Sequence, residues 1–236
     1  MKAQPFTLAT GSGRFDDLIF TPLDLPAPPS IDSEKFIDWM RDDKAHTGTF
    51  PKQRYEKLTG RKYPWLMRAA TGDMASLKEA FPEVYDYALL YPFESVKAVI
   101  FLAQDGHQSV FPHSDSDGLT GMRFYLENRH VEGLHFYKGK QKYDSFNSSQ
   151  LDDSGTPVPV VFENYFDMSD PIYAKFPSTS RAFMLNSARA IHAIDANTCK
   201  LGDRIAVLVQ GKLDVSRFES LVESSLKRYG EYAIWH

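Results

Sequence analysis

From Ser95 onward the sequence is a series of short β-branched and aromatic runs, separated by clusters of Gly, Asp, Asn, Ser and Pro. The connections do not leave room for the crossover helices that parallel strands need, so we expect antiparallel pairing. The number of runs suits a double-sheet jelly roll, the double-stranded β-helix of cupin-like proteins. We expect strands over residues 96–102, 122–126, 134–137, 158–162, 172–176, 182–185, 190–194 and 205–209.

The segments that flank this strand-rich region predict a turn-rich arm and several helices. Residues 1–30 are rich in Pro and Gly, a composition that sustains neither a helix nor a central strand, so they are expected to form an arm on the domain. Apolar residues at helical spacing predict helices over 33–42, 74–90 and 215–229, the second of them interrupted by Pro82.

These segments predict one mainly β domain with flanking helices over residues 1–236. We expect three parts: the arm and helices packing on the barrel (1–94), the jelly-roll core (95–213), and a C-terminal helix and tail (214–236).

Charge and cysteine content narrow the class of protein. The 27 basic and 31 acidic residues give a formal charge of −4 without a basic patch, so neither nucleic acid nor an anionic membrane is expected as a partner. The single cysteine, Cys199, cannot form an internal disulfide, and the N-terminal residues lack the pattern of a signal peptide. We therefore expect a cytoplasmic protein.

The first candidate metal ligands are His113 and Asp115, where the chain leaves a strand-like run for a polar turn. In extended backbone, residues two apart point to the same side, which would present an imidazole and a carboxylate together. The alternative interpretation is a solvated loop.

His192 lies between Ile191 and Ala193, so its ring faces into the fold if this run is a strand. Alone it is more typical of a hydrogen-bonded core histidine. Combined with His113 and Asp115, it gives two imidazoles and one carboxylate, the facial triad of non-haem Fe(II) oxygenases. A zinc site remains open as an alternative, although closed structural zinc sites favour cysteine.

Two arginines have positions that suggest an anion-binding role. Arg123 shares a strand face with Tyr125, opposite Met122, Phe124 and Leu126. Arg204 shares a face with Ala206 and Leu208. Inside a barrel each guanidinium requires compensation by an anion or by hydrogen-bond acceptors, and its planar fork suits a carboxylate. The alternatives for Arg204 are an ion pair with Asp203, Asp195 or Glu127, or extension into solvent.

His113-Ser-Asp115, the distal His192, and Arg204 on the following strand together resemble the Fe(II)/2-oxoglutarate-dependent oxygenase superfamily. Residues 112–128 and 183–213 are most similar to its aspartyl/asparaginyl β-hydroxylase-like branch, which includes small bacterial proline hydroxylases. The resemblance covers about residues 96–213.

The resemblance implies that His113, Asp115 and His192 bind Fe(II). It also implies that Arg204, helped by Arg123, holds the 5-carboxylate of the co-substrate 2-oxoglutarate. Tyr125 occupies a position next to the co-substrate at which the family commonly has histidine. The reaction would consume O2, form succinate and CO2, and hydroxylate an unactivated C–H bond. Asp115 argues against a halogenase, which lacks this carboxylate, while desaturation and cyclisation remain open.

Arg189, Asn186 and His135 are the residues that we expect to contact the substrate. The small size and acidity of the chain favour a free amino acid or a similar small molecule. The alternatives are a hydroxylase of peptide or protein side chains, and a non-catalytic cupin-like binding module whose histidines are structural.

Overall fold

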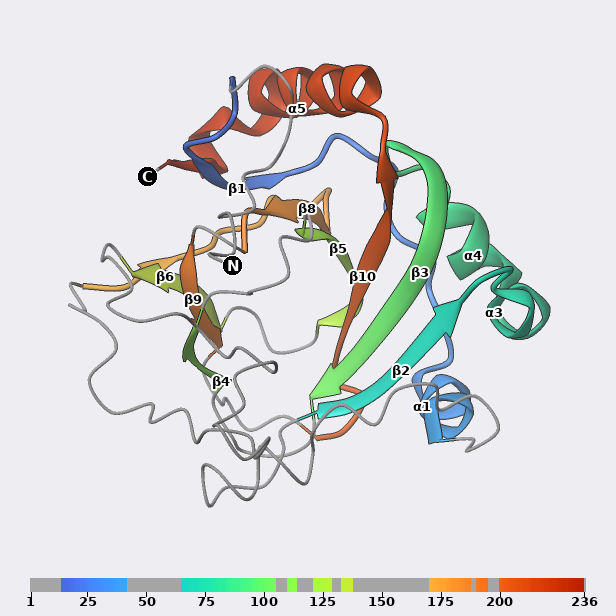
Figure 1. The fold of residues 1–236 in the computed structure, drawn as a ribbon. Coiled ribbons are helices and arrows are strands. Elements are labelled where there is room, and N and C mark those ends of the chain that lie inside the picture. Colours follow the sequence, from blue (N-terminus) through green and yellow to red (C-terminus); the bar gives the residue numbers. More distant parts are fainter. Residues whose placement is uncertain are drawn as a thin grey trace, which may run out of the picture.

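The computed structural model of the chain describes residues 14–41, 65–104, 110–113, 121–128, 133–137, 170–187, 190–194 and 200–235. For residues 65 and 110–113 it describes the backbone alone. The described residues form two antiparallel sheets with an apolar cluster between them, and helices cover the outer face of the larger sheet (Figure 1). The mainly β, jelly-roll class that the strand pattern predicts is confirmed.

The larger sheet has seven strands in the order β11-β1-β8-β5-β10-β3-β2, and every neighbouring pair is antiparallel. Its strands are β1 Leu18–Pro22, β2 Trp65–Thr71, β3 Phe93–Gln104, β5 Gly121–Asn128, β8 Ala182–Leu185, β10 Arg204–Leu213 and β11 Ile234–Trp235. The longest pairing joins β10 to β3, from Ile205 with Ala103 to Leu213 with Phe93.

The smaller sheet has four strands in the order β4-β9-β6-β7. They are β4 Val110–His113, β6 Leu134–Tyr137, β7 Ile172–Tyr173 and β9 Ile191–Ile194. In Figure 1, β4, β6 and β9 lie to the left, across from β10 and β3 on the right. Strand β9 therefore has a neighbour on each side, β4 and β6, and its register is set by pairing with both of them.

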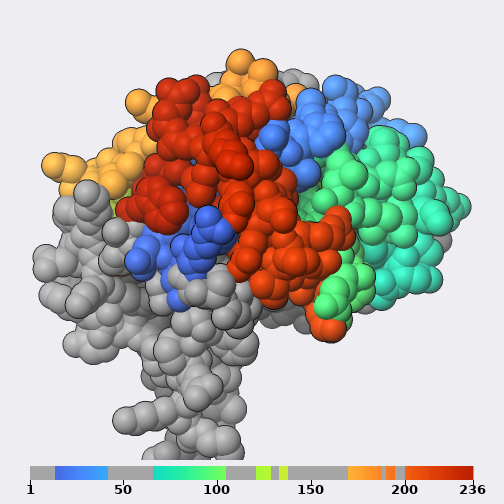
Figure 2. Space-filling view, turned by 90° about the horizontal axis from the view of Figure 1, so that it is seen from above, coloured from blue at the N-terminus to red at the C-terminus, as the bar shows by residue number. Residues whose placement is uncertain are grey.

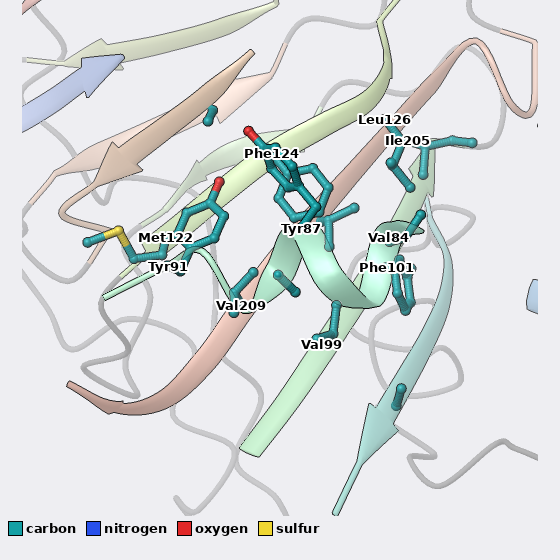
Figure 3. Packing of buried hydrophobic residues seen from close by; sticks show 14 of the residues in the cluster. Val84, Tyr87, Tyr91, Val99, Phe101, Met122, Phe124, Leu126, Ile205 and Val209 are labelled. Atoms are coloured by element: carbon teal, nitrogen blue, oxygen red, sulfur yellow. The ribbon is translucent and has the colours of Figure 1, made fainter. Parts of the chain in front are cut away.

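Helices pack on the outer face of the larger sheet because each one buries an apolar stripe there. They are α1 Ser33–Arg41, α3 Ala75–Ala80, α4 Pro82–Ala88 and α5 Val215–Tyr229, followed by the 3-10 helix η2 Gly230–Tyr232. Figure 3 shows Tyr87 of α4 and the adjacent Tyr91 against Phe124 of β5. The Tyr91 hydroxyl donates to the backbone carbonyl of Arg123 at 2.7 Å. Burial raises the pKa of both phenols, which therefore stay protonated donors.

The C-terminal helix α5 holds the N-terminal segment in place (Figure 2). Its first turn is capped by the Asp214 carboxylate, which accepts from the backbone N–H of Arg217 at 3.1 Å, and this hydrogen bond lowers the pKa of Asp214. Farther along, Arg228 pairs with Asp24 at 2.6 Å, and the Ser225 hydroxyl accepts from the backbone N–H of Asp24. These contacts fix the chain just after β1.

Most of the expected elements are present. The helices predicted over 33–42 and 215–229 are confirmed as α1 and α5, and the region 74–90 divides at Pro82 into α3 and α4. The strand expected over 172–176 is shorter, because only Ile172 and Tyr173 pair with β6. The strand expected over 158–162 lies outside the described residues.

The segment before residue 95 differs from the arm and mostly helical region that the sequence suggested. Residues 18–22 form β1, whose five side chains are all buried between β8 and β11. Its apolar run therefore outweighs the turn-rich composition around it. Strand β2 was also missed, because a run such as WLMRAAT fits a helix as well as a strand until a partner is present. Here that partner is β3.

Gly121, the first residue of β5, allows a close approach of β8. A Cβ atom on Gly121 would lie 2.3 Å from the backbone carbonyl oxygen of Leu185, its partner in the pairing. We expect Gly121→Ala to lower the free energy of unfolding by about 1–3 kcal/mol, the range for a forced overlap in a packed region. Urea denaturation measures this, with Gly230→Ala as the matched control, because nothing lies within 4 Å of a Cβ there. Equal losses in the two variants would contradict the prediction.

Candidate active site

Strands β4 and β9 bring the two candidate histidine ligands together. His113 and His192 are Cα partners in the β4–β9 pairing, although they are far apart in the sequence. Residues directly opposite each other on antiparallel strands share a face of the sheet, with Cβ atoms about 4.5–5.5 Å apart. The two positions therefore lie side by side on one face of the smaller sheet.

That face is the inner one. The partner of His192 on its other side is Phe136 of β6, which belongs to the apolar cluster between the two sheets. Ile194, two residues after His192, belongs to the same cluster. The side chain of His192 is accordingly only 2% exposed. The imidazole of His192 therefore points from the smaller sheet towards the larger one.

The ring orientation of His192 suits a metal ligand. Its Nδ1 lies 3.0 Å from the backbone carbonyl oxygen of Ala190. A carbonyl oxygen only accepts, so Nδ1 is the donor in this contact, and in the neutral form of such a ring Nε2 carries the lone pair. An Nδ1–H bound to a backbone carbonyl is the arrangement that orients metal-binding histidines in many proteins.

Across the sandwich, Arg204 is buried on the inner face of the larger sheet. Its side chain is 5% exposed, and a terminal nitrogen donates to the hydroxyl of Tyr125 at 2.9 Å. The guanidinium carbon also lies 4.9 Å from the centre of the Tyr125 ring. The strand faces expected from alternation are confirmed, because Tyr125 belongs to the cluster between the sheets and Phe124 to the cluster under the helices.

Asn128, which the sequence did not single out, lies beside this arginine. It is the Cα partner of Arg204 at the end of β5. Within the described part of the chain, its side-chain Oδ1 is buried and accepts no hydrogen bond. A buried polar atom without a partner is costly, so such an atom is a candidate for ligand contact. Only the register of β5 against β10 identifies it, since nothing in the local sequence marks this asparagine.

Arg123 also lies on the inner face, at a different place along β5. Its Cα partners are Leu208 of β10 and Phe183 of β8. The Arg123 side chain passes over Gly121, since a Cβ atom on that glycine would come 3.4 Å from the arginine Nε. The two arginines thus share a face but not a location.

Asn186 and His135 make contacts that hold the fold. The Nδ2 of Asn186 donates to the backbone carbonyl of Asp16. The backbone carbonyl of Asn186 accepts from the backbone N–H of Ala190, just before β9. His135 is the partner of Ala193, so it lies on the opposite face of the smaller sheet from His192. The ring of His135 contacts the backbone carbonyl of Gly133 at 2.8 Å. Substrate contact by these two residues stays a prediction.

The structure describes one of the expected site residues only in part and two of them not at all. Asp115 and Arg189 lie outside the described residues, and His113 is described by its backbone alone. Among the side chains that the structure does describe, no three His, Cys, Asp or Glu groups are clustered as metal ligands. The metal site therefore stays a prediction supported by the register of β4 and β9.

Comparisons with known proteins show a distant structural likeness but no similarity of sequence family. No protein-family model matches the chain, and no curated protein matches it. The crystal structure of HygX from Streptomyces hygroscopicus, with nickel and 2-oxoglutarate bound, aligns with a TM-score of 0.38 and 15% identity over 84% of each chain. A similarity this distant assigns no function, so function has to be inferred from the residues of this chain. None of the described helices is long and apolar enough to cross a membrane.

The Arg204–Tyr125 contact makes a prediction about stability. Tyr125→Phe removes the hydroxyl that accepts from a buried guanidinium while keeping the aromatic ring. We expect the free energy of unfolding to fall by about 1–3 kcal/mol, the cost of withdrawing the partner of a buried donor. Tyr85→Phe, which removes a hydroxyl from the partly exposed face of α4, is the matched control. If the urea midpoint shifted no further in Tyr125→Phe than in the control, the hydrogen bond between Arg204 and Tyr125 would not contribute to stability as expected.

Proposed function

We propose that this protein is an Fe(II)/2-oxoglutarate-dependent dioxygenase that hydroxylates a C–H bond of a small, amino-acid-like substrate. The observation that carries the proposal is the register of β4 and β9, which pairs His113 with His192 on the inner face of the smaller sheet. A buried arginine faces the same interior from the larger sheet. Two histidine positions and a buried cation that face one interior are part of what such a reaction requires of the protein, and Asp115 would supply the remaining metal ligand.

The donor set fits a catalytic iron better than a closed structural site. His113 and His192 would supply two imidazole nitrogens, and Asp115, two residues after His113, would supply the carboxylate. Three ligands on one side of the metal leave positions open for a co-substrate and oxygen. The contact between His192 Nδ1 and the Ala190 carbonyl would orient the ring and leave Nε2 to act as the metal ligand.

The surroundings of Arg204 fit the carboxylate of 2-oxoglutarate. The guanidinium presents parallel donors, and its contact with Tyr125 fixes the direction in which they point. The amide of Asn128 lies alongside and can turn over to offer Nδ2 instead of Oδ1. A carboxylate here would accept hydrogen bonds from the arginine and from the buried amide together, which an apolar ligand would not do.

When bound, the iron, 2-oxoglutarate and O2 supply the oxidising chemistry, with succinate and CO2 as co-products. The chain's own residues bind and orient these groups. They also exclude water, because the cluster between the sheets contains closely packed aromatic rings: Phe20 lies 5.8 Å from Phe136 and 5.7 Å from Phe183, centre to centre. A dry interior strengthens the attraction between Arg204 and an anion and limits side reactions.

Metal binding can be measured without turnover. We expect His192→Ala to weaken Fe(II) binding in anaerobic equilibrium dialysis by more than about 100-fold, since a ligand matters more than a residue that only orients one. His236→Ala, which removes an imidazole elsewhere in the sequence, is the matched control and should bind as the parent does. Unchanged affinity in His192→Ala would exclude His192 as a ligand.

Turnover tests the reaction itself. Anaerobically Fe(II)-loaded protein, mixed with 2-oxoglutarate and exposed to oxygen, should form succinate, and the rate should rise with a suitable amino acid among the standard set. We expect His113→Ala and Asp115→Ala to abolish this, because each would lose a metal ligand. Equal 2-oxoglutarate consumption in these variants and the parent would disprove the iron site. Binding of 2-oxoglutarate without succinate formation would support a non-catalytic binding module instead.

Arg204→Ala addresses co-substrate binding. We expect a loss of roughly 2–5 kcal/mol in the free energy of 2-oxoglutarate binding, the range for removing one partner of a buried charged pair. Anaerobic calorimetric titration with 2-oxoglutarate measures it directly. An unchanged dissociation constant would exclude Arg204 as the carboxylate partner.

A further inference from the structure

We propose that Phe176 is a positioning residue for the co-substrate, which acts through the Tyr125 hydroxyl on the direction of the Arg204 guanidinium. The inference rests on the proposed function, because it assumes that Arg204 holds a carboxylate of 2-oxoglutarate. The sequence placed Phe176 only at the end of the strand expected over 172–176, and the family resemblance assigns it no role.

Phe176 lies on the connection that crosses from the smaller sheet to the larger one, between β7 and β8. Near its start, the backbone N–H of Ala174 donates to a carbonyl of β6 at 3.0 Å. At its end, the carbonyl of Arg181 accepts from the backbone N–H of Tyr125 at 3.0 Å. Proline disfavours helical backbone at the residue before it, so Pro177 narrows the conformations of Phe176. The connection is therefore attached to both sheets, and the side chain of Phe176 starts from a restricted backbone.

The ring of Phe176 lies against three aromatic rings on the inner face of the larger sheet. Its centre is 5.3 Å from that of Phe20, 5.3 Å from that of Phe183 and 5.5 Å from that of Tyr125, and each contact is edge-on. These rings come from β1, β8 and β5, which are consecutive neighbours in the sheet. Aromatic rings at this distance prefer particular mutual angles, so Phe176 restrains the orientation of all three.

The orientation of Tyr125 decides where the Arg204 guanidinium points. The tyrosine hydroxyl accepts from a terminal nitrogen of the arginine at 2.9 Å. A rotation of Tyr125 about χ1 would carry this hydroxyl away, and the guanidinium would lose the acceptor that directs it. A binding site needs its donors within about 0.5 Å of their productive positions. A ring that keeps Tyr125 in place therefore contributes to the binding of an anion at Arg204.

Phe176 differs in exposure from the rings that it touches. Phe20, Tyr125 and Phe183 are at most 2% exposed, whereas Phe176 is partly buried and packs against their cluster. Removing a partly exposed ring costs less of the free energy of folding than removing a buried one. A substitution at Phe176 can therefore release Tyr125 in a protein that still folds, so the positioning role can be measured.

Anaerobic calorimetric titration of the Fe(II)-loaded protein with 2-oxoglutarate tests the proposal. We expect Phe176→Ala to raise the dissociation constant about tenfold, near the upper end of what one aromatic pair contributes. Phe176→Leu keeps most of the apolar volume but has no ring edge, so it should still raise the constant at least about threefold. A variant that merely folds less well would show fewer binding sites per chain, and the remaining sites would have the affinity of the parent.

Ile234→Ala is the matched control, because Ile234 is also partly buried against the same cluster. It should bind 2-oxoglutarate as the parent does. Parent-like affinity in both Phe176 variants would overturn the proposal, and so would a weakening in Ile234→Ala as large as that in Phe176→Ala.

A double-mutant cycle tests whether Phe176 acts through the tyrosine hydroxyl. In a Tyr125→Phe background, Phe176→Ala should change the dissociation constant by less than about threefold, because the contact that Phe176 positions is already absent. Equal factors in the two backgrounds would overturn the proposal, since Phe176 would then act independently of that hydroxyl. A parent that binds no 2-oxoglutarate would overturn the proposed function and this inference with it. A parent that binds 2-oxoglutarate with an affinity that does not depend on Phe176 would overturn this inference alone.

Discussion

The buried guanidinium of Arg204 is the constraint on which the interior of this protein depends. A cation that is 5% exposed between two sheets is tolerated only where acceptors surround it, and the Tyr125 hydroxyl is one of them. The tyrosine belongs at the same time to the apolar cluster between the sheets. The same contact therefore contributes both to the packing between the sheets and to the compensation of the buried charge, and it fixes the direction of the guanidinium.

Residues that pack on the outer face of the larger sheet hold the strand that carries Tyr125, the partner of Arg204, in place. Tyr91, next to α4, donates to the backbone carbonyl of Arg123, and its ring packs on Phe124. The strand that carries Arg123 and Tyr125 on its inner face is thus anchored through its outer face. Side chains on strands fixed in this way hold a ligand more precisely than side chains on loops.

Alternation within a strand made much of the candidate site predictable. The sequence MRFYL has only one way to bury Phe124 under the helices, and it leaves Arg123 and Tyr125 on the opposite face. Positions that depend on pairing were not predictable in this way. Asn128 stands beside Arg204 because of the register between β5 and β10, and the direction of the Arg123 side chain follows from the missing side chain of Gly121.

The sequence by itself determined the fold class, the strand faces and the residue types available for a metal and a carboxylate. These follow from local periodicity, which needs no knowledge of partners. Only the tertiary structure decided that residues 18–22 enter the larger sheet, that His113 lies opposite His192, and that the two arginines occupy separate places. Each of these depends on pairing between segments distant in sequence, and strand periodicity is the same whichever partner a strand finds.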